Sequence, residues 1–151
     1  ALPIFQSMQF REIEFLSGGK DEMMLRFFER DKFAHQRLTS RFNGRTVADA
    51  FWDVLKRKGF EVSEKDGKVA SICEILSHPE KHPDLFLMQD LLIDHDENIA
   101  LWRYHHVLMV ERMLGMKRGT GGSEGANYLK TTLSKKFIPE IWEARTELKA
   151  L

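Results

Sequence analysis

The sequence has one cysteine and four prolines among its 151 residues. The single cysteine, Cys73, cannot form a disulfide within the chain and belongs to no cysteine-based metal motif, so we expect a reducing, cytoplasmic location. No apolar run reaches the roughly 18–20 residues that a membrane-spanning helix needs. The first residues lack the basic and continuously apolar segments of a signal peptide, and we therefore expect none.

The chain also lacks an excess of charge of either sign, because 23 basic residues balance 23 acidic ones. This balance gives no electrostatic reason to expect binding to nucleic acid or to a membrane surface. The length suits one domain with a real core. Eleven phenylalanines and seven methionines are many for this length, and they would suit either a pocket for a flat apolar group or a well-filled core.

Strand patterns are missing too, so we predict an all-α fold that forms a single helical domain over residues 1–151. Apolar residues recur with the spacing of helices, and Ser, Thr, Asp and Gly mark where many of these helices begin and end. The predicted helices cover residues 5–16, a segment that begins after Asp21, and residues 35–42, 47–60, 69–76, 84–93, a stretch ending at 114, 126–133 and 140–148.

Charged residues lead to two further expectations about these helices. Arg11, Glu12 and Glu14 should lie on the solvent side of the first helix, opposite its apolar residues. Asp94 or Asp96 should cap the start of a new helix that runs to Leu114, because acidic residues are favoured at helix N-termini.

The stretch from Trp102 to Gly125 carries the most informative pattern in the chain. Its first half is helical and places His106 in the middle of an apolar face, with Arg103 at the edge of that face. A glycine-rich loop containing Thr120 follows. The residues that share the apolar face at 100° per residue are Ile99, Trp102, His106, Met109, Val110 and Met113.

Several kinds of site fail to match the sequence. The glycine loop follows a helix and lacks both the Lys-Ser/Thr of a P-loop and the third glycine of a dinucleotide fingerprint. His78 and His82 have a spacing that can hold zinc on a helix, but prolines lie beside them and no third ligand is near. No nucleophile elbow is present, and Cys73 has no placed histidine partner.

Two interpretations of His106 remain open from the residues alone. It could be a core histidine whose ring nitrogens are satisfied by neighbouring groups. It could also be the axial ligand of a haem, since a neutral imidazole on a rigid helix among large apolar side chains meets that need. Arg103 would then lie where a guanidinium can meet a haem propionate.

Three groups of motifs occur in a fixed order along the chain. The first is Phe5-Gln6-Ser7-x-Gln9-Phe10-Arg11-x-Ile13-Glu14; the second is Trp102-Arg103-Tyr104-His105-His106-Val107, Val110, Arg112, Gly115, Lys117 and Gly119-Thr120-Gly121-Gly122-Ser123-x-Gly125; the third is Tyr128-Leu129 with Phe137-Ile138-Pro139-Glu140-Ile141-Trp142-Glu143-x-Arg145-Thr146. Together they resemble the tryptophan 2,3-dioxygenase family, whose fold is a helical haem-binding bundle of the tryptophan/indoleamine 2,3-dioxygenase type.

The resemblance implies roles for three residues. His106 would be the proximal ligand of a b-type haem, and Thr120 with Gly121 would bind the amino-acid head group of L-tryptophan. The family inserts both atoms of O2 across the indole C2–C3 bond and forms N-formylkynurenine, the first step of tryptophan catabolism. No catalytic residue of the family can be assigned in this part of the chain.

The resemblance also implies missing parts. The family's distal histidine, and the aromatic residue and arginine that bind the substrate carboxylate, precede the Phe-Gln-Ser motif, where this chain has only Ala1 to Ile4. We therefore expect the C-terminal portion of a longer haem dioxygenase, completed by its N-terminal portion or a companion chain and assembled as a homotetramer. A haem-dependent aromatic amino-acid mono-oxygenase and a non-catalytic helical interaction module are the alternatives.

Overall fold

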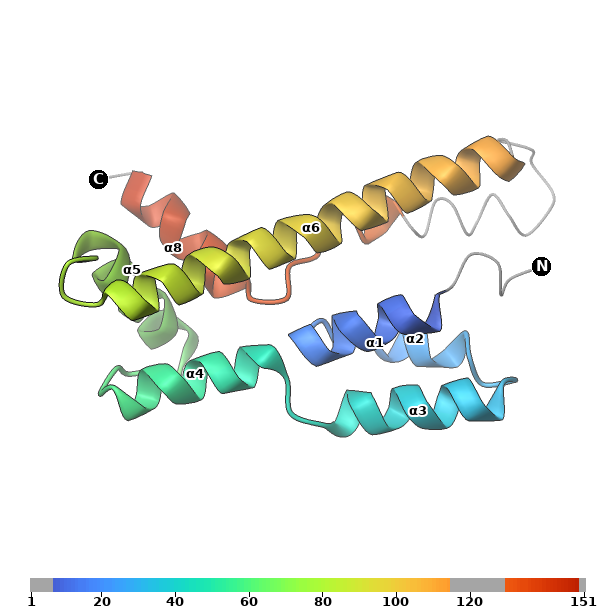
Figure 1. The fold of residues 1–151 in the computed structure, drawn as a ribbon, viewed down its shortest axis with the longest axis horizontal. Coiled ribbons are helices and arrows are strands. Elements are labelled where there is room, and N and C mark those ends of the chain that lie inside the picture. Colours follow the sequence, from blue (N-terminus) through green and yellow to red (C-terminus); the bar gives the residue numbers. More distant parts are fainter. Residues whose placement is uncertain (1–6, 115–129, 150–151) are drawn as a thin grey trace.

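The computed structural model describes residues 7–114 and 130–149. Every regular element within these ranges is a helix, which confirms the all-α fold (Figure 1). The helices are α1 (Met8–Ser17), α2 (Glu22–Arg26), α3 (Lys32–Asn43), α4 (Val47–Arg57), α5 (Lys65–Ser77), α6 (Pro83–Leu114) and α8 (Pro139–Lys149).

Helix α6 runs along the whole molecule, with α5 and α8 beside its first half and α1 to α3 near its second half (Figure 1). The predicted break at Asp94 or Asp96 is wrong, because α6 continues through both residues. Asp96 is only 2% exposed, and its Oδ2 accepts a hydrogen bond of 2.8 Å from Nε1 of Trp142 in α8. Its carboxylate therefore joins two helices instead of capping one.

Two apolar clusters form the core. The larger cluster joins α4, α5, α6 and α8, and it includes one residue of α1; the smaller cluster joins α1, α2 and α3. The larger one comprises Phe10, Phe51, Leu55, Val69, Ile72, Ile75, Leu85, Ile93, Ile99, Phe137, Ile138, Ile141 and Ala144; the smaller one comprises Phe15, Met24, Phe28, Ala34 and Leu38.

Helix α1 begins and ends with local signals that the sequence carries. The Ser7 hydroxyl accepts a hydrogen bond of 3.2 Å from the backbone N–H of Phe10, and Gly18 follows the last turn with φ of 133°. A Cβ atom on Gly18 would lie 3.0 Å from Cβ of Ala48, at the start of α4. Glycine is thus favoured here both by its backbone conformation and by the close approach of α4.

Apart from the helix predicted over residues 126–133, which lies mostly outside or at the edge of the described residues, the remaining predicted helices are confirmed in existence, with shifted ends. Asp21 caps α2 as expected, and Thr46 with Asp49 forms a reciprocal capping box at the start of α4. Helix α3 begins earlier than predicted, because Asp31 accepts a hydrogen bond from a backbone N–H of its first turn. Helix α5 begins at Lys65, four residues before the start of the helix predicted over residues 69–76.

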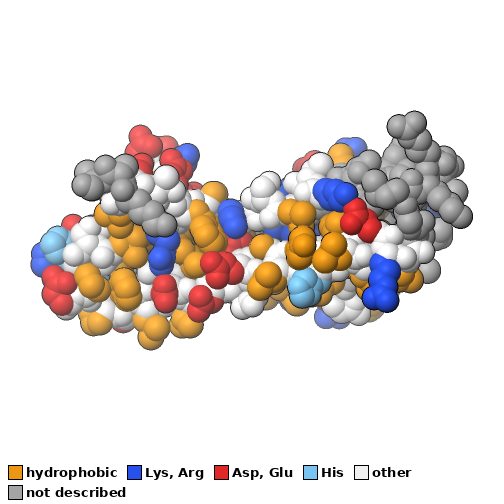
Figure 2. Space-filling model, turned by 90° about the horizontal axis from the view of Figure 1, so that it is seen from above, with side chains coloured by type: hydrophobic (Ala, Val, Ile, Leu, Met, Phe, Trp, Pro, Cys, Tyr) orange, Lys and Arg blue, Asp and Glu red, His pale blue; other side chains and the backbone are white. Residues whose placement is uncertain are grey.

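The outward face of α6 carries many apolar side chains. Figure 2 shows hydrophobic side chains at intervals along the molecule, interrupted by acidic ones near the middle. Within the described ranges, no helix combines the length and the apolar character needed to cross a bilayer. The large exposed apolar residues of α6 are Leu87, Leu91, Leu101, Trp102, Tyr104, Leu108, Met109 and Met113.

Candidate functional site

His106 lies in the second half of α6, and it is the one buried histidine in the part of the chain that the structure describes. The predicted apolar face is correct only in part, since Ile99 and Val110 are buried with His106 while Trp102 and Met109 are exposed. Met113, the sixth residue of that face, is also exposed. The buried stripe is rotated towards Arg103, so His106 lies at its border, 9% exposed, beside an exposed apolar surface.

Three aromatic rings form a column at this border. The indole of Trp102 stacks on the imidazole of His106, with ring centroids 4.7 Å apart and planes 13° from parallel. The ring of Phe10 in α1 stacks on the same indole at 3.5 Å and 14°. We refer to Phe10, Trp102 and His106 as the ring column. It connects α1 to the imidazole through side-chain contacts alone.

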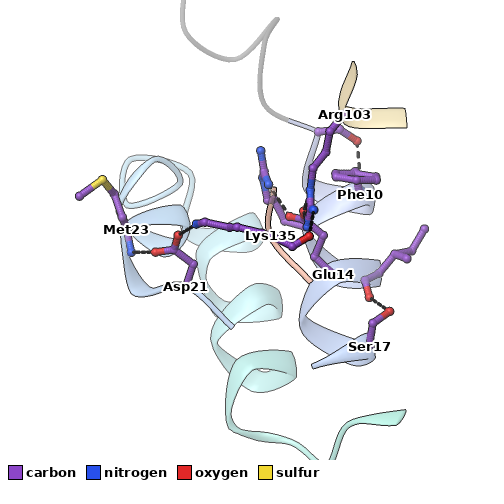
Figure 3. A network of polar contacts seen from close by, with 10 residues as sticks. Phe10, Glu14, Ser17, Asp21, Met23, Arg103 and Lys135 are labelled. Atoms are coloured by element: carbon purple, nitrogen blue, oxygen red, sulfur yellow. Dashed lines mark hydrogen bonds and ion pairs between the residues drawn. The ribbon is translucent and has the colours of Figure 1, made fainter. Parts of the chain in front are cut away.

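The sequence predicts that Arg103 lies at the edge of the apolar face, where it could meet a haem propionate. In the structure its side chain instead points into the protein, towards Glu14 (Figure 3). Its Nε donates to Oε1 of Glu14 at 2.7 Å, and its Nη1 donates to the carbonyl oxygen of Lys135 at 2.9 Å. The side chain is buried. Because its guanidinium binds these two acceptors, Arg103 is a structural link between α1, α6 and the segment before α8.

The prediction that Arg11 and Glu14 face solvent is also wrong. They are 3% and 4% exposed, and they form an ion pair with each other. Glu14 therefore forms ion pairs with two guanidiniums, those of Arg11 and Arg103, which explains why a carboxylate can be buried at this position. The sequence did not reveal this burial, because oppositely charged residues one turn apart on a helix usually form a pair on its solvent-exposed surface.

A third ion pair lies at the edge of this network. The ammonium group of Lys135 binds the carboxylate of Asp21, which also accepts a hydrogen bond of 2.9 Å from the backbone N–H of Met23 (Figure 3). Partial burial raises the pKa of Asp21, but the hydrogen bond and the charge of Lys135 outweigh it, so the net pKa is lowered. Asp21 therefore has two roles: it binds Lys135, in the segment before α8, and it caps α2.

The predicted substrate residues Thr120 and Gly121 lie outside the described residues, as does the glycine loop that contains them. Residues 126–129 of the helix predicted over 126–133 also lie outside, whereas Lys130 and Thr131 are helical. The structure thus places the histidine of the predicted site, and the contribution of the loop stays a prediction.

The donor groups around His106 indicate what kind of metal centre could form there. Within residues 7–114 and 130–149, no group of three or more His, Cys, Asp or Glu side chains could hold a metal ion. A zinc ion bound by protein side chains needs three or four such ligands, whereas haem iron needs a single axial imidazole because the macrocycle supplies four nitrogens. His106 offers one buried imidazole beside exposed apolar side chains, and these are the chemical features that a haem would require of the protein at this position.

Comparison with known proteins adds the deciding observation. The family model described as tryptophan 2,3-dioxygenase matches residues 31–148. The chain belongs to the tryptophan 2,3-dioxygenase family. Tryptophan 2,3-dioxygenase of Nocardioides sp. is 41% identical over 95% of this chain, that of Myxococcus xanthus 37% over 95%, and that of Serratia proteamaculans 36% over 97%.

The chain spans about half the length of the curated relatives it matches, namely 54% of the Nocardioides and Myxococcus proteins and 57% of the Serratia protein. The family match includes all of α6, and therefore Trp102 and His106, together with all of α8 except its last residue. Phe10 and Glu14 precede the matched residues 31–148. Their contacts with α6 could not have been found from local sequence patterns, because they depend on how α1 packs.

Proposed function

We propose that this chain supplies the haem-binding portion of a tryptophan 2,3-dioxygenase, with His106 as the axial ligand of a b-type haem. The observation that carries the proposal is the position of His106, which is a single imidazole on a long helix at the border of an exposed apolar surface. A flat apolar macrocycle would cover such a surface, and in many haem proteins the iron is bound by a neutral imidazole nitrogen of a histidine.

Haem, when bound, would supply the iron chemistry that activates O2 for insertion across the indole C2–C3 bond of L-tryptophan. The residues of this chain would hold and orient the reactants. His106 would fix the cofactor, and Thr120 with Gly121 would fix the amino-acid head group of the substrate by polar contacts of the loop. The product of this proposed reaction is N-formylkynurenine.

We also propose that the protein acts together with an N-terminal portion, either in the same polypeptide or as a companion chain. The half-length match to the relatives supports this view, and so do the large apolar side chains that α6 exposes, because exposed apolar patches commonly mark protein–protein contact sites. A homotetramer would cover such surfaces as well. The single cysteine, Cys73, agrees with a location in the reducing cytoplasm.

The proposal can be tested by complementation. The chain would be co-expressed with the segment of the Nocardioides enzyme that it does not match, supplied with haem and L-tryptophan, and incubated with 18O2. Mass spectrometry of the product should show two labelled oxygen atoms. A product with one labelled atom would instead indicate a haem-dependent aromatic mono-oxygenase. If the assembled pair binds no haem and forms no product, a non-catalytic helical interaction module becomes the better account.

A further inference from the structure

We propose that Trp102 is a positioning residue that sets the plane of the His106 imidazole, and that Phe10 supports Trp102 in this role. This inference rests on the proposed function, because it concerns the orientation of a haem ligand. It is carried by the geometry of the ring column, in which both stacked contacts are within 14° of parallel.

The helix alone does not fix the plane of this imidazole. Packing against the preceding turn restricts χ1 of a helical histidine, whereas χ2 is a torsion onto a planar ring and has broad, roughly two-fold minima. A neighbour that lies flat against the ring restrains this second torsion, because rotation of the imidazole would bring its edge into the neighbouring face. Trp102 is four residues before His106, the spacing at which side chains of one helix meet, and its indole lies nearly parallel to the imidazole.

The indole is itself held from outside α6. Phe10 and His106 are both so close to the Trp102 ring that they would overlap if they lay on the same face, so they lie on opposite faces of the indole. Phe10 is buried in the larger apolar cluster, and the backbone of α1 is tied to α6 by the Glu14–Arg103 pair. Trp102 is 38% exposed and would be mobile without this support.

The orientation of the imidazole matters for a haem because the ring plane determines how the nitrogen lone pair and the ring orbitals meet the iron and the macrocycle. Environments that hold the axial ligand tune the electronic properties of the metal. A restrained imidazole should therefore give one narrow spectroscopic population, and a released one should give a broader or shifted distribution.

The test uses the haem-loaded protein and compares Trp102→Leu with Trp102→Phe, Phe10→Leu and Tyr104→Leu. Tyr104 is the matched control, because it is an exposed aromatic residue of α6 that stacks on no residue of the ring column within the described contacts. The readouts are the iron–histidine stretching band of the ferrous protein in resonance Raman spectra, the g-values of the ferric protein, and the rate at which haem is lost to apomyoglobin.

Trp102→Leu and Phe10→Leu should shift or broaden the stretching band, and Trp102→Leu should release haem about two- to tenfold faster, as expected when one aromatic pair is lost. Trp102→Phe should stay close to the wild type, because an aromatic face is kept. Tyr104→Leu should change neither readout. If Trp102→Leu leaves the band and the rate unchanged while His106→Ala abolishes the band, the positioning role is wrong and the proposed function stands. If His106→Ala itself keeps the band, the proposed axial ligand is wrong.

Discussion

Glu14 of α1 and Arg103 of α6 form a buried ion pair, in which one carboxylate oxygen lies 2.7 Å from Nε and 2.6 Å from Nη2 of the guanidinium. Phe10 lies one helical turn before Glu14, and Trp102 directly precedes Arg103. The ion pair and the ring column therefore join the same two helices at adjacent positions. The segment that carries His106 is held against α1 by a polar contact and an aromatic contact at once.

The first prediction concerns this ion pair. Glu14→Gln should lower the free energy of unfolding by roughly 3–5 kcal/mol, because it removes a buried carboxylate from between two guanidiniums. Urea denaturation followed by circular dichroism would measure the change. Glu12→Gln is the control on the same helix: its pair with Arg37 lies at the surface, where such contacts contribute about 1 kcal/mol or less. Equal losses for the two variants would contradict a special role for the buried pair.

The second prediction concerns pH and Asp96. Burial raises the pKa of Asp96, although the hydrogen bond from Trp142 and the charge of Lys136 oppose the rise. A folded pKa above the ordinary value of 3.8 means that the folded protein binds this proton more tightly than the unfolded chain does. The contribution of Asp96 to stability is therefore largest below pH 3.8 and declines as the pH rises through the folded pKa.

Asp96→Asn should remove this decline and keep an oxygen that accepts the Trp142 N–H, so its stability near neutral pH should be no lower than that of the wild type. Asp96→Ala should be less stable by about 1–3 kcal/mol, because it leaves the indole N–H buried without an acceptor. Thermal unfolding of the three proteins at several pH values would show both effects. A wild-type stability that rises with pH relative to Asp96→Asn would refute the assigned direction.

The third prediction concerns Cys73. Partial burial raises the pKa of its thiol, and the nearby carboxylate of Glu147 adds to the effect. Since the thiolate is the reactive form, Cys73 should react with a disulfide reagent such as DTNB more slowly in the folded protein than in urea. Glu147→Gln should accelerate the folded-state reaction modestly. A reaction as fast in the folded protein as in urea would show that the thiol is neither shielded nor perturbed.

The fold follows from the sequence wherever local signals act alone. Thr46 and Asp49 form the capping box that begins α4, Asp21 caps α2 as expected, and Gly18 ends α1 as its residue type favours. Prediction failed where a tertiary contact outweighed a local preference. Asp96 has a residue type that suits a helix start, but the indole of Trp142, 46 positions away, provides its partner within a continuous helix.

The position of His106 was predictable to a similar extent, while its role stays a proposal. Helical periodicity placed His106 next to an apolar face, and family motifs gave it a role. The same periodicity could not decide which neighbours of His106 are buried. An arginine on a helix is expected to face solvent, and Arg103 is buried only because the packing of α1 brings the carboxylate of Glu14 against it. Phe10 could be assigned only to its own helix, since its contact with Trp102 spans most of the chain.

The central claim is that His106 binds haem iron, and visible spectroscopy tests it most directly. The chain, assembled with the segment of the Nocardioides enzyme that it does not match and loaded with haem, should show a Soret band typical of axial histidine ligation. His105→Ala should keep that band, because His105 is exposed on a different side of α6. His106→Ala should lose it, and added imidazole should restore it. A His106→Ala protein whose Soret band matches the wild type would contradict the account.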